Sequence, residues 1–322
     1  MKRHSMVQCL RLAGVLAAIA AGLNVQPASA QESEKDPNEY VQRVMIADAN
    51  GDHLGILTNI PGYTHSGSPA WSADSQMIAF DAWKGGLGET YVKAQIVVAP
   101  LNGSEPRILG DGAMPSFSPD GTHLVYSRYS PNYGIWVQRI DEEGHPPQLI
   151  ASDGWCGRWS PDGTCISFTA YEGGKHNICL QTIADGSRRF LFPTNTDHPY
   201  RTVYWNYSWS ADGKLISGAA DTPDGKREIY TITTSTDAPV ITRHQFSPLG
   251  SRVTFTPDGK LMFGLERDKK QQMYTLDFQN MDAEPVPFPC PPGYKVSIGE
   301  MSPDGKLVAF IMVAPLPEFA RR

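Results

Sequence analysis

The side chains best suited to chemistry lie in three loops of unusual composition: residues 81–88, residues 127–133 together with 171–175, and residues 194–207. The third loop is the longest and holds His198 and Arg201 among aromatic residues. Aromatic rings beside Arg, His and Asp suit stacking on sugar rings or on a peptide segment. The same rings are equally typical of a cap over the core beneath a long loop. Both interpretations stay open from the sequence.

The candidates for ligand binding are the aromatic and charged residues of these loops: Trp83, Lys84, Tyr129, Tyr133, Tyr171, Asp197, His198, Tyr200, Arg201 and Trp205. No catalytic residue can be named. The chain lacks the G-x-S-x-G elbow of serine hydrolases and the H-E-x-x-H zinc motif, so no cofactor and no metal are expected. His65 and His244 have no spacing that supports a metal or acid–base role. Residues 48–52 resemble part of a calcium loop but lack its spacing, which favours a turn.

A repeated five-residue sequence motif, which we call the phrase, indicates which strands position these loops. An aromatic or Met residue, Ser or Thr, Pro or Ala, Asp, and then Gly or Ser recur six times. Pro presets the first corner of a turn, Asp bonds its own nearby backbone, and Gly accepts positive φ, so the phrase predicts a hairpin turn. The six aspartates are Asp74, Asp120, Asp162, Asp212, Asp258 and Asp304. We interpret them as turn residues, one per repeat, and not as a ring of catalytic carboxylates.

The phrases are spaced by 42 to 50 residues, the length of a four-stranded propeller blade. Each is followed by a short apolar strand, and the first five then continue into a segment that reads as two strands around a turn. After the sixth phrase there is room for two strands only. Residues 40–57 have the missing strand-turn-strand pattern. The sequence therefore predicts an all-β, six-bladed β-propeller over residues 40–319, with its last blade closed by N-terminal strands.

The first 30 residues predict a signal peptide: a basic start, an apolar run over 12–23, and Ala28-Ser29-Ala30 as a cleavage site. Residues 31–39 then form a short N-terminal segment. We expect a periplasmic or secreted monomer with no membrane span after cleavage.

The net charge is −6 and no basic cluster occurs, so nucleic-acid binding is not expected. Four cysteines remain in the mature part, and their pairing is left open: Cys156, Cys165, Cys179 and Cys290.

The six phrases closely resemble the blade repeats of TolB-like propellers, the WD-type repeats with an aromatic-Ser-Pro-Asp-Gly signature. The resemblance covers nearly the whole mature chain, without the α/β domain that precedes the propeller in TolB proper. It implies a non-catalytic propeller that binds an envelope protein or a glycan at the channel mouth. Similar repeats occur in oligogalacturonate lyases, which implies the alternative of a lyase or hydrolase acting on polysaccharides or oligosaccharides. For that alternative the candidate residues are Asp197, His198, Tyr200 and Arg201.

Overall fold

The computed structural model describes residues 40–84, 91–129, 131–142, 144–195, 197–235, 238–280, 282–289 and 299–315. The chain divides into two units, residues 1–36 and 37–322, and all described residues lie in the second. The predicted signal peptide, the segment 31–39, residues 85–88 of the first candidate loop, and Cys290 lie outside the described residues.

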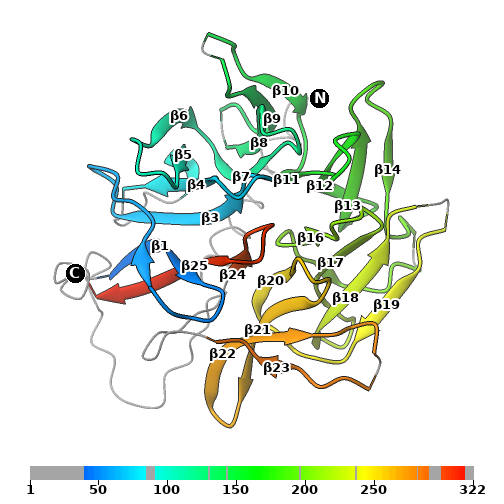
Figure 1. Cartoon of the computed structure of the whole chain (residues 1–322). Helices are drawn as coiled ribbons and strands as arrows, with labels where there is room; N and C mark the ends of the chain where they lie inside the picture. The colour runs from blue at the N-terminus through cyan, green and yellow to red at the C-terminus, as the bar shows by residue number, and fades with distance from the viewer. Residues whose placement is uncertain are drawn as a thin grey trace, which may run out of the picture. The chain divides into compact units, whose positions relative to one another are not determined.

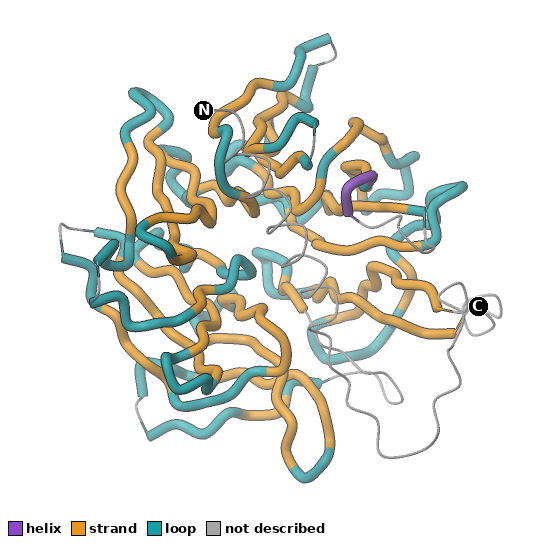
Figure 2. Tube along the Cα trace, turned by 180° about the vertical axis from the view of Figure 1, so that it is seen from behind, coloured by secondary structure: helices purple, strands orange, loops and turns teal. Residues whose placement is uncertain are grey.

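The described residues form strands in five sheets and a short 3-10 helix, η2 (Tyr91–Lys93) (Figure 2). Two four-stranded sheets consist of β7 (Ala113–Phe117), β8 (His123–Arg128), β9 (Gly134–Arg139) and β10 (Gln148–Ala151), and of β11 (Trp155–Trp159), β12 (Cys165–Glu172), β13 (Lys175–Thr182) and β14 (Arg188–Phe190). A five-stranded sheet consists of β15 (Thr202–Val203), β16 (Ser208–Trp209), β17 (Leu215–Asp221), β18 (Arg227–Thr233) and β19 (Ile241–His244). Another four-stranded sheet consists of β20 (Leu249–Phe255), β21 (Leu261–Arg267), β22 (Lys270–Leu276) and β23 (Val286–Pro287).

The fifth sheet has eight strands and joins both ends of the described chain. Its members are β1 (Tyr40–Asp48), β2 (Gly55–Ile56), β3 (His65–Trp71), β4 (Met77–Trp83), β5 (Gln95–Pro100), β6 (Arg107–Asp111), β24 (Gly299–Met301) and β25 (Leu307–Pro315). β1 pairs with β25 antiparallel along its whole length, whereas β1 and β3 share the single parallel pair Gln42–His65. The described pairings thus separate four blades, and not six, and leave eight strands in one further sheet.

The sheets have a propeller arrangement. Their first strands gather around a common centre, and the later strands lie further out (Figure 1). Neighbouring first strands contact one another: β3 with β7, β7 with β11, β16 with β20, β20 with β24, and β24 with β3. The buried residues of neighbouring sheets pack together in shared apolar clusters. The second strands β4, β8, β12, β17 and β21 are therefore buried along most of their length.

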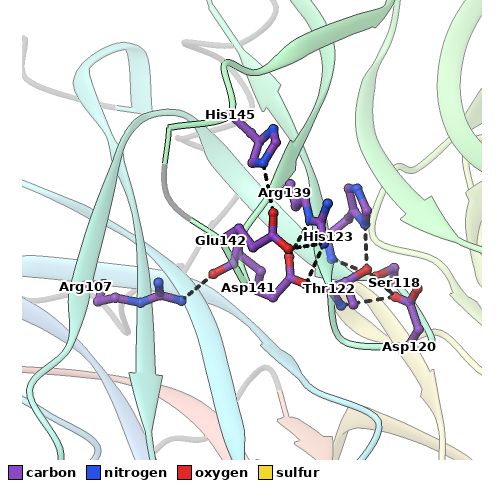
Figure 3. A network of polar contacts seen from close by, with 10 residues as sticks. Arg107, Ser118, Asp120, Thr122, His123, Arg139, Asp141, Glu142 and His145 are labelled. Carbon is purple, nitrogen blue, oxygen red and sulfur yellow. Dashed lines mark hydrogen bonds and ion pairs between the residues drawn. The ribbon is translucent and has the colours of Figure 1, made fainter.

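The repeated phrase forms the predicted turn. In the second repeat, the Ser118 hydroxyl donates to Asp120 Oδ1 at 2.5 Å, and the Thr122 backbone N–H donates to the same oxygen at 3.0 Å (Figure 3). The His123 N–H in turn donates to Ser118 Oγ at 2.9 Å. The same hydroxyl-to-aspartate bond recurs in the other five phrases. These aspartates therefore bind local groups of the turn, as expected for a structural role.

The outer turn of the same sheet lies beside this hairpin turn. Arg139 donates to Asp141 at 2.7 Å and to Glu142 at 2.8 Å, and His145 lies 3.1 Å from Glu142 (Figure 3). All these groups are well exposed, so water and salt screen the ion pairs and each contributes little to stability.

The Asp120 turn makes stability depend on pH. Hydrogen bonds from Ser118 and Thr122 lower the pKa of Asp120 from its ordinary 3.8 to about 2. A lowered folded-state pKa gives stability that is complete above the ordinary pKa and is lost as pH falls towards 2. We expect Asp120→Asn to reduce the fall in Tm between about pH 5 and pH 2 by about 1 to 3 °C, a small change because the group is exposed. Thermal melts followed by circular dichroism, with Glu105→Gln as the control, test this; equal slopes for Asp120→Asn and wild type would contradict it.

Candidate functional site

The two ends of the sheets carry different segments. The repeated turns join first to second strands at one end. At the other end lie the connections between sheets and the hairpin loops between second and third strands, because β8 runs away from its Asp120 turn and pairs Arg128 with Gly134 at its far end. We call this second end the loop face. All three candidate loops have residues there, where the sequence predicts a binding surface.

Five rings form a continuous array on the loop face, which we call the aromatic track: Tyr171, His176, Trp155, Trp205 and Tyr204. Successive ring centroids lie 5.5 Å apart for Tyr171–His176, 5.2 Å for His176–Trp155, 6.3 Å for Trp155–Trp205 and 6.1 Å for Trp205–Tyr204. These separations are those of interacting aromatic pairs. The track thus connects the sheet of β11–β14 with the sheet of β15–β19.

Strand register explains how the track is assembled. Tyr171 and His176 are directly paired across β12 and β13, and Trp155 starts β11 opposite Thr169. Trp205 lies in the segment 204–207 between β15 and β16, which both pair with β17. This first strand holds more residues between its two paired parts than β17 does, so it bulges and brings Trp205 beside Trp155.

The track offers both open ring surface and an unused donor. Tyr171 is 60% exposed, and Trp205 is half-buried. The Trp155 indole Nε1 is buried and has no hydrogen-bond partner among the described residues. Burial lowers the pKa of His176, so its imidazole is neutral at pH 7. A ligand lying along these rings would meet apolar ring faces at Tyr171 and Trp205.

A charged cluster continues the track at Tyr204. The Arg227 guanidinium lies 4.4 Å from the centre of the Tyr204 ring, and the Tyr204 hydroxyl donates to Asp221 Oδ2 at 2.8 Å. Asp221 also accepts from Arg227 Nε at 3.1 Å and faces Arg201 Nη2 at 3.5 Å. Burial, followed by the bond to Asp221, raises the pKa of Tyr204. Its hydroxyl therefore stays protonated at neutral pH and acts as a fixed donor.

This charged cluster borders a polar cleft of about 890 Å³. The cleft is lined by the β17–β18 hairpin and by the connection that follows β19: Asp221, Thr222, Asp224, Gly225, Lys226, Arg227, Glu228, Arg243, Gln245, Ser247 and Pro248. Glu228 and Arg243 form a bidentate ion pair there, in which the two N–O distances are 2.5 and 2.9 Å. The cleft wall thus carries opposite charges that already hold one another in place.

The hairpin beside the cleft contains a seventh copy of the turn phrase, which was not predicted from the sequence. In Thr222-Pro223-Asp224-Gly225 the Thr222 hydroxyl donates to Asp224, and the Lys226 N–H donates to Thr222 Oγ1. This copy joins β17 to β18, so it lies on the loop face, and no aromatic residue precedes it. The four residues themselves are the signal that could have located the cleft in the sequence.

The structure places most of the predicted candidates on the loop face, in different surroundings. Tyr171, Trp205 and Arg201 belong to the track and its charged end. Trp83 and Lys84 lie at the end of β4, where Trp83 is buried and stacks on His65 with centroids 5.5 Å apart. Two further candidates, Tyr129 and Tyr133, are half-buried in the loop after β8.

The remaining candidates, Asp197, His198 and Tyr200, do not come together as a site. Tyr200 is fully buried and packs edge-on against Phe192, so this candidate for ligand binding is instead part of a cap over the core. His198 is 4% exposed and stacks on Phe192 at 5.3 Å, whereas Asp197 is exposed and faces Asn195. The physical reason is that the chain before β15 covers the apolar space between two sheets.

Among the residues placed by the structure, no three His, Cys, Asp or Glu side chains are close enough to hold a metal ion. Cys156, Cys165 and Cys179 are free thiols, and burial raises the pKa of Cys179 to about 12. In the same described ranges, no helix is long and apolar enough to cross a membrane.

Comparison with known proteins identifies the fold. A protein from Agrobacterium tumefaciens assigned as a TolB superposes with a TM-score of 0.62 at 16% identity, covering 86% of this chain and 99% of that one. TolB from Acinetobacter baumannii gives 0.57 at 19% identity, covering 93% and 69%. An oligogalacturonate lyase from Vibrio parahaemolyticus gives 0.51 at 14% identity, covering 69% and 68%.

These likenesses establish an all-β propeller fold and carry no activity, since one fold hosts many functions. No protein-family model matches the chain, and no curated protein matches it by sequence.

Proposed function

We propose that this chain is an exported, TolB-like propeller without catalytic activity, which binds a protein or glycan partner of the cell envelope along the aromatic track. The observation that carries the proposal is the track itself: five rings in sequence, ending in a charged cluster, beside a polar cleft. Export and a periplasmic location rest on the signal-peptide pattern of residues 1–30.

The proposal includes six blades, with β1 completing the last one. Six apolar clusters support this count, because each draws its buried residues from two neighbouring repeats. The cluster that holds Val44, Phe80 and Ala309 combines the first and last repeats with the N-terminal strand. We therefore count the eight-stranded sheet as two blades that meet at the single Gln42–His65 pair.

The chemistry of the track favours a partner with flat apolar faces and hydrogen-bonding groups at their edges. Sugar rings and extended peptides both have this character. The paired Asp221 and Arg227 present a fixed pattern of acceptor and donor at the charged end of the track. A preformed pattern of this kind costs little ordering on binding.

We expect Trp205→Ala to weaken binding of the partner at least about tenfold, because it interrupts the track at its centre. The partner is first captured from envelope extract or on a glycan array with the mature protein, and affinity is then measured by calorimetry. Trp136→Ala is the matched control, since Trp136 lies outside the track, with Arg128 over its ring at 4.6 Å. Equal affinities of Trp205→Ala and Trp136→Ala would overturn the assignment of the site.

The alternative is a lyase or hydrolase acting on polysaccharides or oligosaccharides at the same face. Tyr204 and Asp221, which are hydrogen-bonded to each other, are groups on this face that could move a proton. Turnover of an oligosaccharide that Tyr204→Phe abolishes, with affinity retained, would favour this alternative over the binding function.

A further inference from the structure

Two arginines lie near the centre of the propeller. They belong to strands other than β17 and β18, whose hairpin lines the polar cleft. Arg158 belongs to β11 and Arg252 to β20, both of which are first strands close to the common centre (Figure 1). Arg158 is 7% exposed and Arg252 is 6% exposed. Arginine is rarely buried to this extent unless its charge is matched.

Each guanidinium is held by the backbone of a different sheet. Arg158 Nη1 donates to the Pro115 carbonyl at 3.2 Å, and Arg252 Nη2 donates to the Pro69 carbonyl at 3.2 Å. Arg252 also pairs with Glu300. Arg158 Nε is buried and has no hydrogen-bond partner among the described residues. One donor of a buried, permanently charged group is thus left unused.

Two carboxyls lie near the two arginines. Glu300 is the partner of Arg252, and its side chain keeps 26% exposure. The second nearby carboxyl, Asp81, is fully buried and accepts from the Met114 N–H at 2.9 Å, and burial raises its pKa. Cys156 and Tyr207 also lie near, and burial raises the pKa of each, which keeps both neutral.

A guanidinium does not release its proton. Within the described residues, Arg252 forms an ion pair with Glu300, whereas no carboxylate forms an ion pair with Arg158. Leaving a buried charge without a counter-charge is costly, and an added anion removes that cost. The guanidinium fork matches the geometry of an oxyanion, which it binds through parallel N–H bonds. The partial exposure of Glu300 shows that solvent reaches the edge of the cluster.

We propose that Arg158 and Arg252 form a binding site for a small oxyanion of the sulfate, phosphate or carboxylate class. The anion accepts from Arg158 Nε and gives the Arg158 guanidinium an ion-pair partner. This site goes beyond the proposed partner-binding function, and either can exist without the other.

Thermal unfolding of the mature protein in increasing sodium sulfate tests the site, with sodium chloride at matched ionic strength as the reference. We expect a saturable rise in Tm with sulfate alone, and we expect Arg158→Gln to raise the half-saturating sulfate concentration about tenfold. Arg267→Gln, which removes an exposed arginine paired with Glu284, should leave that concentration unchanged. An equal rise in chloride, or the same half-saturation in Arg158→Gln and wild type, would contradict the proposal.

A second measurement keeps the test decisive if Arg158→Gln does not fold. Crystals of the wild-type protein are soaked in selenate, and the anomalous difference map is inspected beside Arg158 Nε. A peak within hydrogen-bond distance of Arg158 supports the site. A map without a peak at that position rejects it, whether or not selenate binds elsewhere.

Discussion

A chain that lacks residues 1–57 is expected not to fold, whereas a chain that lacks only residues 1–36 should melt like the intact mature protein. The longer deletion removes β1, which pairs with β25 from Tyr40–Pro315 to Asp48–Leu307. It also removes Val44, Met45 and Ala47, which are at most 2% exposed and belong to two apolar clusters. Their loss leaves β25 as an open sheet edge, which promotes aggregation.

Circular dichroism and size-exclusion chromatography of the two deletions measure this effect. A matched pair of substitutions isolates the packing: Val44→Asp places a charge in the buried cluster and should cost about 3 to 5 kcal/mol. Val313→Asp places the same charge on β25, where Val313 is 52% exposed, and should have little effect. A cooperative melt of the 58–322 fragment near the wild-type Tm would show that β1 is dispensable.

The second large effect is expected at Tyr230, in the cluster between the sheets of β11–β14 and β15–β19. Tyr230 is fully buried, with ring centroids 5.3 Å from Phe192 and 5.7 Å from Tyr200. Tyr230→Ala leaves a large cavity among these rings and should destabilise the fold by about 3 to 5 kcal/mol. For a chain of this size, we expect Tm to fall by about 5 to 15 °C.

The control is Tyr230→Phe, because the Tyr230 hydroxyl is buried without a hydrogen-bond partner among the described residues. Removing the hydroxyl keeps the packing and relieves an unsatisfied polar group, so stability should be unchanged or slightly higher. Urea unfolding followed by tryptophan fluorescence gives both values. A loss in Tyr230→Phe as large as in Tyr230→Ala would show that the hydroxyl, and not the ring, stabilises the cluster.

The turn phrase explains why the propeller arrangement could be predicted from sequence. Its hydroxyl, aspartate and glycine act within a few residues, as the bonds of Ser118 and Asp120 show, so no distant contact is needed to form the turn. The strand pattern of residues 40–57 was local too, and β1 and β2 form there. The number of blades is harder to define from pairings, because one bridge between Gln42 and His65 joins two sets of strands.

The candidate site was predictable only in part. Aromatic content pointed to Tyr171 and Trp205, but their link through Trp155 and His176 depends on which strands become neighbours. The same loop composition also selected Tyr200, which lies in the core, since a ring that caps a core and a ring that binds a ligand look alike in sequence. Burial depends on tertiary packing, which local patterns do not encode.

The pairing of β1 with β25 has a consequence for how the chain acquires its structure. The two strands come from opposite ends of the described chain, so their ladder has the largest sequence separation of any in the molecule's described part. Contacts between residues so far apart in the sequence form late, because closing the long loop costs chain entropy before the contact contributes any stability. We therefore expect β1 to remain unpaired until synthesis is almost complete. The protein would pass through a stage in which the sheets between these two strands have formed while a strand edge is still unpaired. That edge would be exposed to proteins that bind nascent chains.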